Sequence, residues 1–274
     1  EAQLNQNIFG ENPLEQKPTR EGFGRGLVEA GEKDVRVVGL CADLAESTKM
    51  HYFNEKFPDR YIEVGVAEQN LATLASGLAN YGKIPFITSY AAFSPGRNWE
   101  QIRTTIAINN VPVKIVGSHA GISVGPDGAT HQMLEDMALM RALPNMIVIN
   151  PCDSIEAHKA TLAIAKNDKP SYLRLGRSNT TVFTTNETPF EIGKAQIFFE
   201  TPLPVVGIIS TGALTHNAIQ AAKELGDEGI PVNVLHLATI KPIDVDAIVS
   251  LARASGAIVT VEEHQVTGGL GSAV

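Results

Sequence analysis

The chain has 274 residues, 43% apolar and 19% charged, and its 22 basic and 30 acidic side chains give a formal net charge of -8. This length suggests two domains, and the acidic balance argues against binding to nucleic acid or to an anionic membrane surface. No apolar run is long enough to span a bilayer, whereas a small anionic substrate remains compatible because it needs only a few local cations.

The chain begins with a polar lead-in, residues 1–16, which we expect to pack on a partner or to be loose. Strands and helices alternate from residue 17. The expected strands are 35–40, 61–64, 85–89, 113–117, 146–150 and 172–175, and the expected helices are 20–32, 67–81, 98–108, 134–142 and 154–166. Continuous apolar strands between amphipathic helices indicate a parallel sheet covered on both faces. We therefore expect a six-stranded parallel α/β domain over 17–178.

A Thr- and Asn-rich linker is expected over 179–192, followed by a smaller α/β domain over 193–274. The expected strands of this domain are 194–199, 205–210, 232–236 and 258–261, and its expected helices are 216–225 and 245–254. The glycines at 268–271 open a further helix, and we expect the domain to lack its last elements.

Two cysteines, Cys41 and Cys152, lie far apart in the sequence, and each follows an expected strand. We interpret them as buried, reduced thiols of a cytoplasmic protein. No spacing of ligand-type residues suits a zinc site, so we expect no metal ligands on this chain.

Polar and aromatic residues follow most of the expected strands. They are Asp43, Glu68, Phe93, His119, Asp127, His131 and Arg177. Each alone has an ordinary interpretation: Glu68 complements a helix start, His119 is a surface imidazole, and His131 caps a helix. Parallel strands gather their carboxyl ends along one edge, where α/β sheets place ligands, so together these residues indicate a site. The long Gly-rich loop 118–132 supports this, because such loops are usually functional and let backbone approach a ligand.

The motifs GVAEQN (65–70) and GPDGATHQ (125–132) resemble the pyrimidine-binding half of transketolases. The resemblance covers essentially residues 18–274. It extends to TRxxxG (19–24), ADLAEST (42–48), SYAAF (89–93), NPCD (150–153), LRLGRSN (173–179), IKPID (240–244) and VEEHQVTGGLG (261–271). It implies a thiamine diphosphate pyrimidine-binding domain followed by a mixed-sheet transketolase C-terminal domain.

The resemblance implies a role for each candidate residue. Glu68 is the carboxyl that hydrogen-bonds the pyrimidine of thiamine diphosphate, and Phe93 stacks on that ring. Asp43 faces the thiazolium side of the cofactor. His131 lies near the pyrimidine and the reacting carbonyl, where it hydrogen-bonds or relays protons.

A second group of residues is implied to bind substrate. Asp127 reads a sugar hydroxyl next to the bond that is broken. The sugar phosphate is gripped by Arg20, Ser47, His119 and Arg177, and arginine suits phosphate through its paired planar donors. The implied reaction transfers a two-carbon ketol unit from a ketose phosphate to an aldose phosphate.

No GDG motif, which holds the diphosphate and Mg2+ in full-length transketolases, is present in this sequence. The chain therefore resembles the C-terminal subunit of a split, two-gene transketolase. The implied partner is an N-terminal subunit that supplies the diphosphate and Mg2+ site. The resemblance also implies self-association of this subunit, in an α2β2 assembly.

Three alternatives remain open at this stage. A 1-deoxyxylulose-5-phosphate synthase shares the GxAEQ and DGxTHQ patterns, although SHAG (118–121), IKPID and VEEH look more like transketolase. The β subunit of a 2-oxoacid dehydrogenase E1 is disfavoured by the DGATHQ loop. A non-catalytic regulatory subunit has no chemical need for Glu68, Asp127, His131 and Arg177 together.

Overall fold

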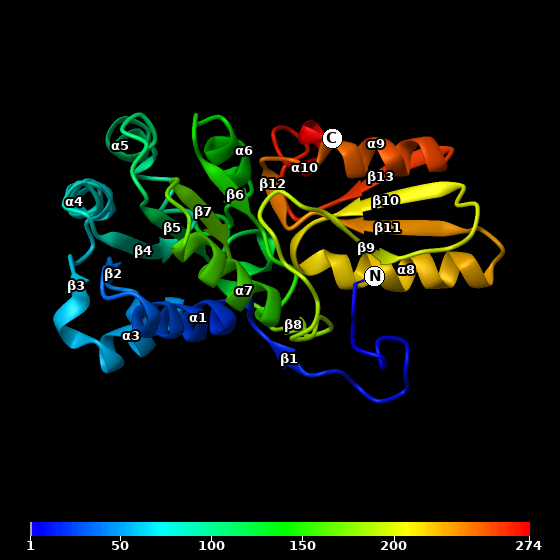
Figure 1. Ribbon diagram of the computed structural model, residues 1–274, viewed down its shortest axis with the longest axis horizontal. Helices are drawn as coiled ribbons and strands as arrows, with labels where there is room; N and C mark the ends of the chain where they lie inside the picture. The colour runs from blue at the N-terminus through cyan, green and yellow to red at the C-terminus, as the bar shows by residue number, and fades with distance from the viewer. Residues whose placement is uncertain (1) are drawn as a thin grey trace.

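The computed structural model describes residues 2–274, which form two α/β domains side by side (Figure 1). The larger domain contains β2 (Val37–Cys41), β3 (Tyr61–Glu63), β4 (Ile84–Tyr90), β5 (Lys114–Ser118), β6 (Ile147–Ile149) and β7 (Ser171–Arg174). Neighbouring strands among these six are parallel, in the order β6-β7-β5-β4-β2-β3. The predicted six-stranded parallel sheet is confirmed, and its carboxyl ends share one edge.

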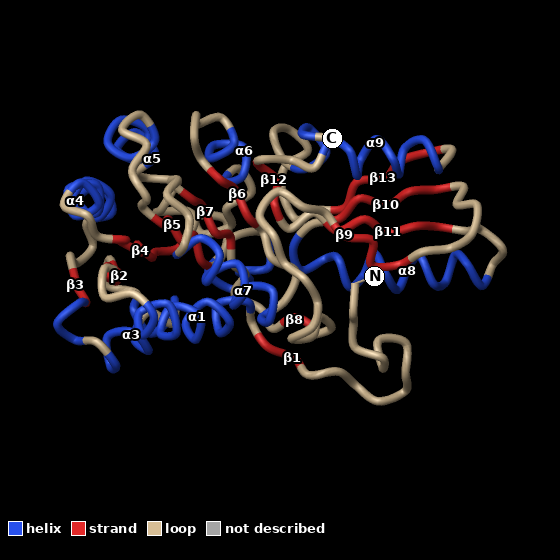
Figure 2. Tube along the Cα trace, viewed as in Figure 1, coloured by secondary structure: helices blue, strands red, loops and turns tan. Residues whose placement is uncertain are grey.

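Helices cover both faces of this sheet (Figure 2). One face carries α1 (Thr19–Lys33), α3 (His51–Lys56) and α7 (Ser154–Ala165); the other carries α4 (Glu68–Asn80), α5 (Trp99–Gln101), the π-helix η2 (Ile102–Ala107) and α6 (Asp136–Arg141). Two separate apolar cores result, one around Phe23 and Phe53 and the other around Leu71 and Met140. Short helical segments α2 (Ala45–Thr48), η1 (Pro58–Arg60) and η3 (Ile122–Asp127) lie in the loops.

The smaller domain has a four-stranded mixed sheet. Its strands are β9 (Gln196–Phe199), β10 (Val206–Ser210), β11 (Val232–His236) and β13 (Ala257–Val261), in the order β13-β10-β11-β9. β10 is parallel to both neighbours and β9 is antiparallel to β11. The helices α8 (Thr215–Asp227) and α9 (Val245–Ala254) flank it on opposite sides, and η4 (Gly212–Leu214) and α10 (Leu270–Ala273) complete the domain (Figure 1).

The segment that carries the IKPID motif joins the two domains. β12 (Thr239–Lys241) comes from the second half of the chain but pairs antiparallel with β6, as the seventh strand of the large sheet. It covers the backbone of β6, which would otherwise be a free sheet edge. The sequence did not predict this strand, because three residues are too few to show an alternating pattern.

The polar lead-in contacts its own chain. β1 (Gln16–Lys17) pairs antiparallel with β8 (Thr180–Thr181), and a bridge joins Leu4 to Thr184. Ala2, Leu4, Ile8 and Leu14 pack against the core of the smaller domain. Apolar residues at intervals within the lead-in thus attach it across the domain boundary.

A buried polar cluster also connects the domains. His236 Nε2 lies 2.8 Å from Glu156 Oε2, and the Cys152 backbone N–H donates to the same oxygen at 2.7 Å. The ligand-type atoms of Cys152, Glu156 and His236 all lie within 4.8 Å of one another. Because Glu156 is already hydrogen-bonded and His236 Nδ1 bonds Thr215 Oγ1, we interpret this cluster as an interdomain hydrogen-bond network.

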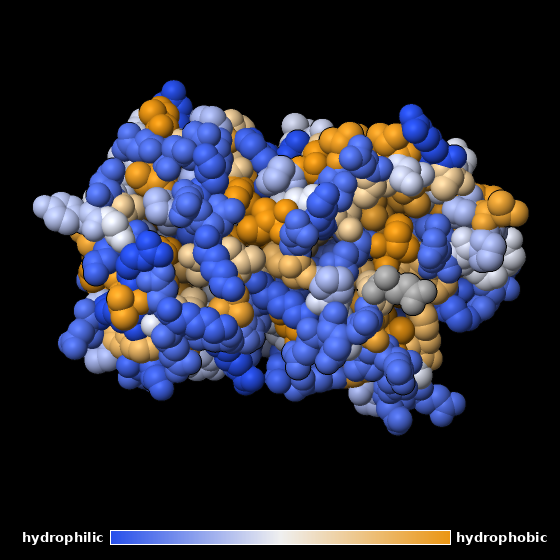
Figure 3. Space-filling model, viewed as in Figure 1, coloured by the Kyte–Doolittle hydropathy of each residue, from blue (hydrophilic) through white to orange (hydrophobic). Residues whose placement is uncertain are grey.

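The surface is mostly hydrophilic on the face shown in Figure 3. Apolar side chains gather there over α9, whose Val245 and Val249 are 59% and 37% exposed. Both cysteines are free and buried, as predicted. Within residues 2–274, no helix has the length and apolar character needed to cross a membrane.

Candidate active site

Arg20, from the first turn of α1, meets His119 at the end of β5. Arg20 Nη1 lies 3.1 Å from His119 Nε2, and His119 Nδ1 lies 2.8 Å from Ser118 Oγ. A guanidinium only donates, so His119 Nε2 accepts and Nδ1 carries the proton that points to Ser118. His119 is 3% exposed and has a φ of +57°, so the interpretation of His119 as a surface imidazole is wrong.

The electrostatics of this pair agree with that tautomer. Burial, and after it the charges of Arg20, Arg177 and His131, together lower the pKa of His119 to about 3. Burial also lowers the pKa of Arg20, although the guanidinium stays charged at any physiological pH. His119 therefore remains a neutral acceptor that holds the Arg20 fork in one orientation.

Aromatic rings extend the site beyond this pair. The Tyr90 ring stacks on His119, with centroids 3.9 Å apart, and is nearly parallel to Phe93 at 6.1 Å. His131 meets the Phe93 ring edge-on at 5.2 Å, and its Nδ1 bonds Thr130 Oγ1 at 2.9 Å. α6 begins only at Asp136 and has no side-chain cap, so the interpretation of His131 as a helix cap is wrong.

The Gly-rich loop is attached to this cluster through Arg177. Arg177 Nη1 donates to the Val124 carbonyl oxygen at 3.1 Å, beyond the end of β7. Gly125 and Gly128 both have a φ of +76°, a conformation that side chains other than glycine rarely adopt. They flank Asp127, which is exposed. The sharp turns thus direct the loop toward Arg177 and leave Asp127 at its surface.

Glu68 lies at the other end of the sheet edge, where it opens α4 after β3. It is 5% exposed, and Asn98 Nδ2 donates to its backbone carbonyl at 2.9 Å. No hydrogen bond from residues 2–274 reaches its carboxylate. Neither oxygen is among the fully enclosed atoms that lack a partner, so the carboxylate of this otherwise buried residue is open to a hydrogen-bond donor from outside this chain.

Glu63 shapes the backbone around Asp43 and Glu68. Its Oε1 accepts from the N–H groups of Asp43 and Gly65, both at 2.8 Å, and its Oε2 accepts from the Tyr61 hydroxyl at 2.6 Å. Asp43 and Gly65 have φ values of +59° and +70°. One carboxylate thus holds two turns with positive φ, one carrying Asp43 and one, at Gly65, leading into the helix that starts with Glu68.

The structure therefore brings together five of the residues predicted from sequence and a sixth, Tyr90, that was not predicted. We call this group the aromatic–cationic cluster: Arg20, Tyr90, Phe93, His119, His131 and Arg177. Asp43, Glu68 and Ser47 follow β2 and β3 on the same edge, and within residues 2–274 they make no side-chain hydrogen bond with the cluster. The sequence patterns did not single out Tyr90 or Glu63, although both end strands and so met the criterion applied to their neighbours.

Two family models match this chain: the transketolase pyrimidine binding domain over residues 15–182 and the transketolase C-terminal domain over residues 195–274. The chain belongs to the transketolase family. This confirms the resemblance drawn from the motifs, and it assigns the larger sheet and the smaller mixed sheet to the two transketolase domains.

Related transketolase proteins match over nearly the whole chain. Identity is 44% over 260 residues with the putative transketolase C-terminal section of Methanocaldococcus jannaschii, covering 94% of this chain and 81% of that protein. The chain is also 39% identical over 260 residues to the 6-deoxy-6-sulfo-D-fructose transketolase subunit SqwH of a Clostridium species. That match covers 95% of this chain and 80% of the Clostridium protein.

Solved transketolase structures share the fold. A split gene transketolase, described as an inactive beta4 tetramer, matches with a TM-score of 0.87 and 43% identity over 94% of this chain and 84% of that chain. The transketolase from Leishmania mexicana matches with a TM-score of 0.82 and 26% identity, over 97% of this chain and 41% of that one.

Proposed function

We propose that this chain is the C-terminal subunit of a split, thiamine diphosphate-dependent transketolase. The reaction moves a two-carbon ketol unit from a ketose phosphate to an aldose phosphate. The observation that carries the proposal is Glu68, a buried carboxylate at the sheet edge that no donor in residues 2–274 reaches. Membership of the transketolase family supports the cofactor assignment.

The residues present fit the pyrimidine end of the cofactor. Glu68 offers an unpaired acceptor for a ring nitrogen, and Phe93 with Tyr90 offers nearly parallel ring faces for stacking. When bound, thiamine diphosphate supplies the nucleophilic carbon that takes up the ketol unit. Glu68 holds the pyrimidine and shares its proton, and the apolar Val64 and Leu71 beside it limit access of water.

The aromatic–cationic cluster fits the phosphate end of a sugar phosphate. Arg20 and Arg177 supply planar paired donors, and neutral His119 orients Arg20 without competing for the anion. His131, packed edge-on to Phe93, is placed to exchange a proton with the carbonyl or hydroxyl of the substrate. Asp127, Ser47 and Asp43 are assigned to the sugar hydroxyl, the phosphate and the thiazolium side by the family resemblance.

The proposed partner is an N-terminal transketolase subunit that holds the diphosphate and Mg2+. The match to a protein named as a transketolase C-terminal section supports this division. The relative solved as an inactive beta4 tetramer supports self-association of this kind of subunit and the need for a partner. We propose that two copies of each subunit assemble and form the site between chains.

A substrate comparison in the mixture of both subunits tests this function. With thiamine diphosphate and Mg2+, a ketose phosphate donor and ribose 5-phosphate should give ketol transfer, whereas pyruvate should be a poor donor. A preference for pyruvate would favour the deoxyxylulose phosphate synthase or the oxoacid dehydrogenase alternative. Assembly without turnover of either donor would favour the non-catalytic alternative.

A further inference from the structure

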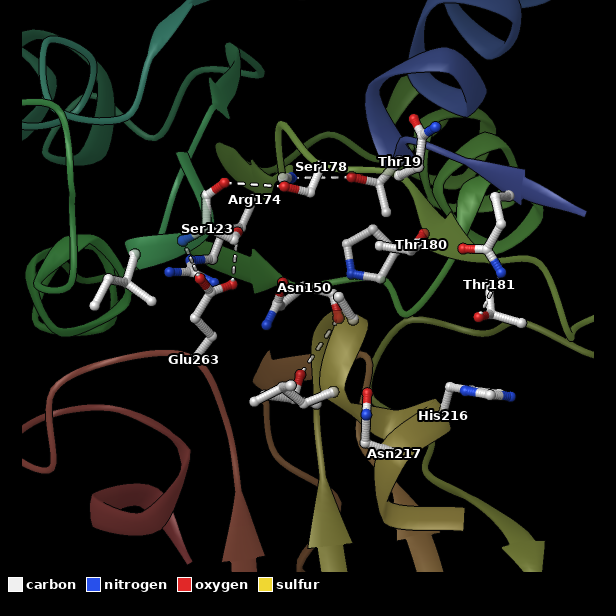
Figure 4. A pocket seen from close by; sticks show the side chains of 18 residues that line it. Thr19, Ser123, Asn150, Arg174, Ser178, Thr180, Thr181, His216, Asn217 and Glu263 are labelled. Carbon is white, nitrogen blue, oxygen red and sulfur yellow. Dashed lines mark hydrogen bonds between the residues drawn. The ribbon is translucent and has the colours of Figure 1, made fainter. Parts of the chain in front are cut away.

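Two neighbouring acids, Glu262 and Glu263, follow β13 and bond to different domains. Glu262 accepts from the N–H groups of Leu270 at 2.6 Å and Gly271 at 3.0 Å, at the start of α10 in its own domain. Glu263 reaches the larger domain, where its Oε1 accepts from the Ser123 N–H at 2.7 Å and its Oε2 from the Ser123 hydroxyl at 3.2 Å. Figure 4 shows this contact beside a cavity of about 410 Å³ between the domains. Glu263 thus connects the smaller domain to the Gly-rich loop.

The backbone on both sides of this contact fits it closely. Two residues beyond Glu263, the Gln265 N–H donates to the Leu134 carbonyl oxygen at 2.9 Å, just past the end of the loop. On the loop side, Gly121 has a φ of +84°, and a Cβ on this residue would lie 2.4 Å from the Glu263 carboxyl carbon. Glycine permits both the backbone angle and the close approach. The loop and the smaller domain are therefore shaped to meet at Glu263.

Three side chains converge on residues 123 and 124 of the loop. Besides the contact from Glu263, the Ser178 hydroxyl donates to the Ser123 carbonyl oxygen at 2.9 Å, and Arg177 Nη1 donates to the Val124 carbonyl oxygen at 3.1 Å. Val124 itself is fully buried. Because Arg177 belongs to the aromatic–cationic cluster, these two loop residues join the smaller domain to the proposed phosphate grip.

Asp127 follows this anchored pair within the same short helical segment, η3. It is exposed, and its carboxylate makes no hydrogen bond with residues 2–274, so its position depends on the backbone around it. The Gly128 N–H donates to the Gly125 carbonyl oxygen at 3.1 Å, and the His131 N–H donates to the Gly128 carbonyl oxygen at 2.9 Å. The anchor at residue 123 therefore determines where Asp127 and His131 lie.

We propose that Glu263 is a positioning residue for sugar recognition: by holding Ser123, it sets Asp127 against the substrate. The inference rests on the proposed function, in which Asp127 reads a sugar hydroxyl. Glu263 accepts from both donors of Ser123, and hydrogen bonds to an ionised acceptor are stronger than those between neutral groups. The smaller domain supplies no residue of the aromatic–cationic cluster, but through Glu263 it takes part in substrate discrimination.

Two substitutions separate the reach of Glu263 from its charge. Glu263→Asp keeps the charge but is one methylene shorter, so it meets Ser123 only if the loop moves. Glu263→Gln keeps the length, because its amide oxygen accepts from the Ser123 N–H and its amide nitrogen donates to the Ser123 hydroxyl. Glu262→Ala is the control, since Glu262 bonds only within its own domain.

Hydrogen exchange of the isolated chain measures the anchor without turnover. The Ser123 amide should exchange at least about tenfold faster in Glu263→Asp than in Glu263→Gln, because a hydrogen bond to a charged acceptor is lost. The parent chain and Glu262→Ala should both exchange as slowly as Glu263→Gln. Equal exchange in Glu263→Asp and Glu263→Gln would show that Glu263 does not anchor the loop.

Kinetics in the mixture of subunits measure discrimination between two acceptors, ribose 5-phosphate and 2-deoxyribose 5-phosphate. The second lacks the hydroxyl next to the reacting aldehyde. Glu263→Asp should lower kcat/KM at least about tenfold for ribose 5-phosphate and less than about twofold for the deoxy sugar, because only the first uses the displaced carboxylate. Glu263→Gln should stay within about threefold of the parent for both acceptors.

The same comparison in an Asp127→Ala background shows whether Glu263 acts through Asp127. There, Glu263→Asp should have little further effect, because the two residues serve one contact. Equal losses for the two acceptors, or a tenfold loss that persists in the Asp127→Ala background, would overturn the positioning role. A parent mixture that transfers no ketol unit would instead contradict the proposed function, and hydrogen exchange would still decide whether Glu263 holds the loop.

Discussion

The two ends of the large sheet's carboxyl edge differ in how far this chain completes them. Arg20, His119 and Tyr90 hold one another through a 3.1 Å contact and a ring stack at 3.9 Å. At the other end, Glu63 orders the backbone, while the Glu68 carboxylate has no donor within residues 2–274. At the first end the side chains are held in place by contacts within the chain. At the second end the backbone is ordered, but the Glu68 carboxylate has no hydrogen-bond donor among the described residues.

The largest effect should come from the unfinished end. Glu68→Gln keeps the shape of the side chain but removes its ability to share a proton, so turnover in the mixture of subunits should fall at least about 10³-fold. The thermal midpoint of the isolated variant should stay close to that of the parent chain, since no partner within the described residues is lost. Turnover within a few-fold of the parent would remove Glu68 from the mechanism.

A smaller effect, of a different kind, is expected at the preorganised end. Arg177→Ala should raise the Michaelis constant for phosphorylated substrates about 10- to 100-fold, the loss of one charge-assisted hydrogen bond. Unphosphorylated analogues should show little change. Steady-state kinetics with matched sugar and sugar phosphate pairs measure this. An equal loss for both members of a pair would contradict the phosphate role.

The neutral state of His119 should appear in the pH dependence of stability. Its folded pKa of about 3 lies below the ordinary 6.5, so the unfolded chain takes up the proton first. The contribution of neutral His119 to the free energy of unfolding is therefore complete above pH 6.5 and decreases as the pH falls.

His119→Asn should remove this component. Between pH 7 and pH 5 the variant should lose about 2 kcal/mol less free energy of unfolding than the parent, at about 1.4 kcal/mol per pH unit below 6.5. Urea unfolding at both pH values measures the difference, and His51→Asn, outside the cluster, serves as the control. Parallel losses in the parent and His119→Asn would show that His119 is not held neutral.

The frame at the unfinished end can be tested through Glu63. Glu63→Ala removes the acceptor for two backbone N–H groups, and each such bond contributes about 1 kcal/mol. The affinity of the mixture for thiamine diphosphate should fall about tenfold. Tyr61→Phe keeps both backbone bonds and loses only the 2.6 Å hydroxyl contact, so its affinity should stay within about twofold. Equal effects of the two variants would mean that the turns do not depend on Glu63.

Much of this fold was predictable, because long apolar strands and amphipathic helices each leave a periodic pattern. Val232–His236 and Val245–Ala254 were predicted with the observed bounds. The β12, β1 and β8 strands have two or three residues, too few for such a pattern, and they depend on partners distant in sequence. The predicted helix 98–108 continues as the π-helix η2, a change in hydrogen-bond register that periodicity does not show.

The sequence predicted which residues gather at the sheet edge but not how their side chains are arranged. Parallel topology brings residues after strand ends to one edge, so the convergence of Phe93, His119 and Arg177 followed from the strand pattern. The pairing of Arg20 with His119 depends on which way two side chains turn across 99 residues. The hydrogen bonds between Glu63 and two turns require positive φ values at Asp43 and Gly65, which cannot be predicted from the sequence pattern. The crevice between the domains depends on their packing, which neither domain's pattern contains.

The central claim is that this chain completes only half of an active site. The most direct measurement is ketol transfer from a ketose phosphate to ribose 5-phosphate, with thiamine diphosphate and Mg2+ present. It is assayed for this chain alone, for an N-terminal transketolase subunit alone and for the two together. Turnover should appear only in the mixture and should vanish when Glu68→Gln replaces the parent chain. Turnover by this chain alone, or an inactive mixture that nevertheless assembles with bound cofactor, would contradict the account.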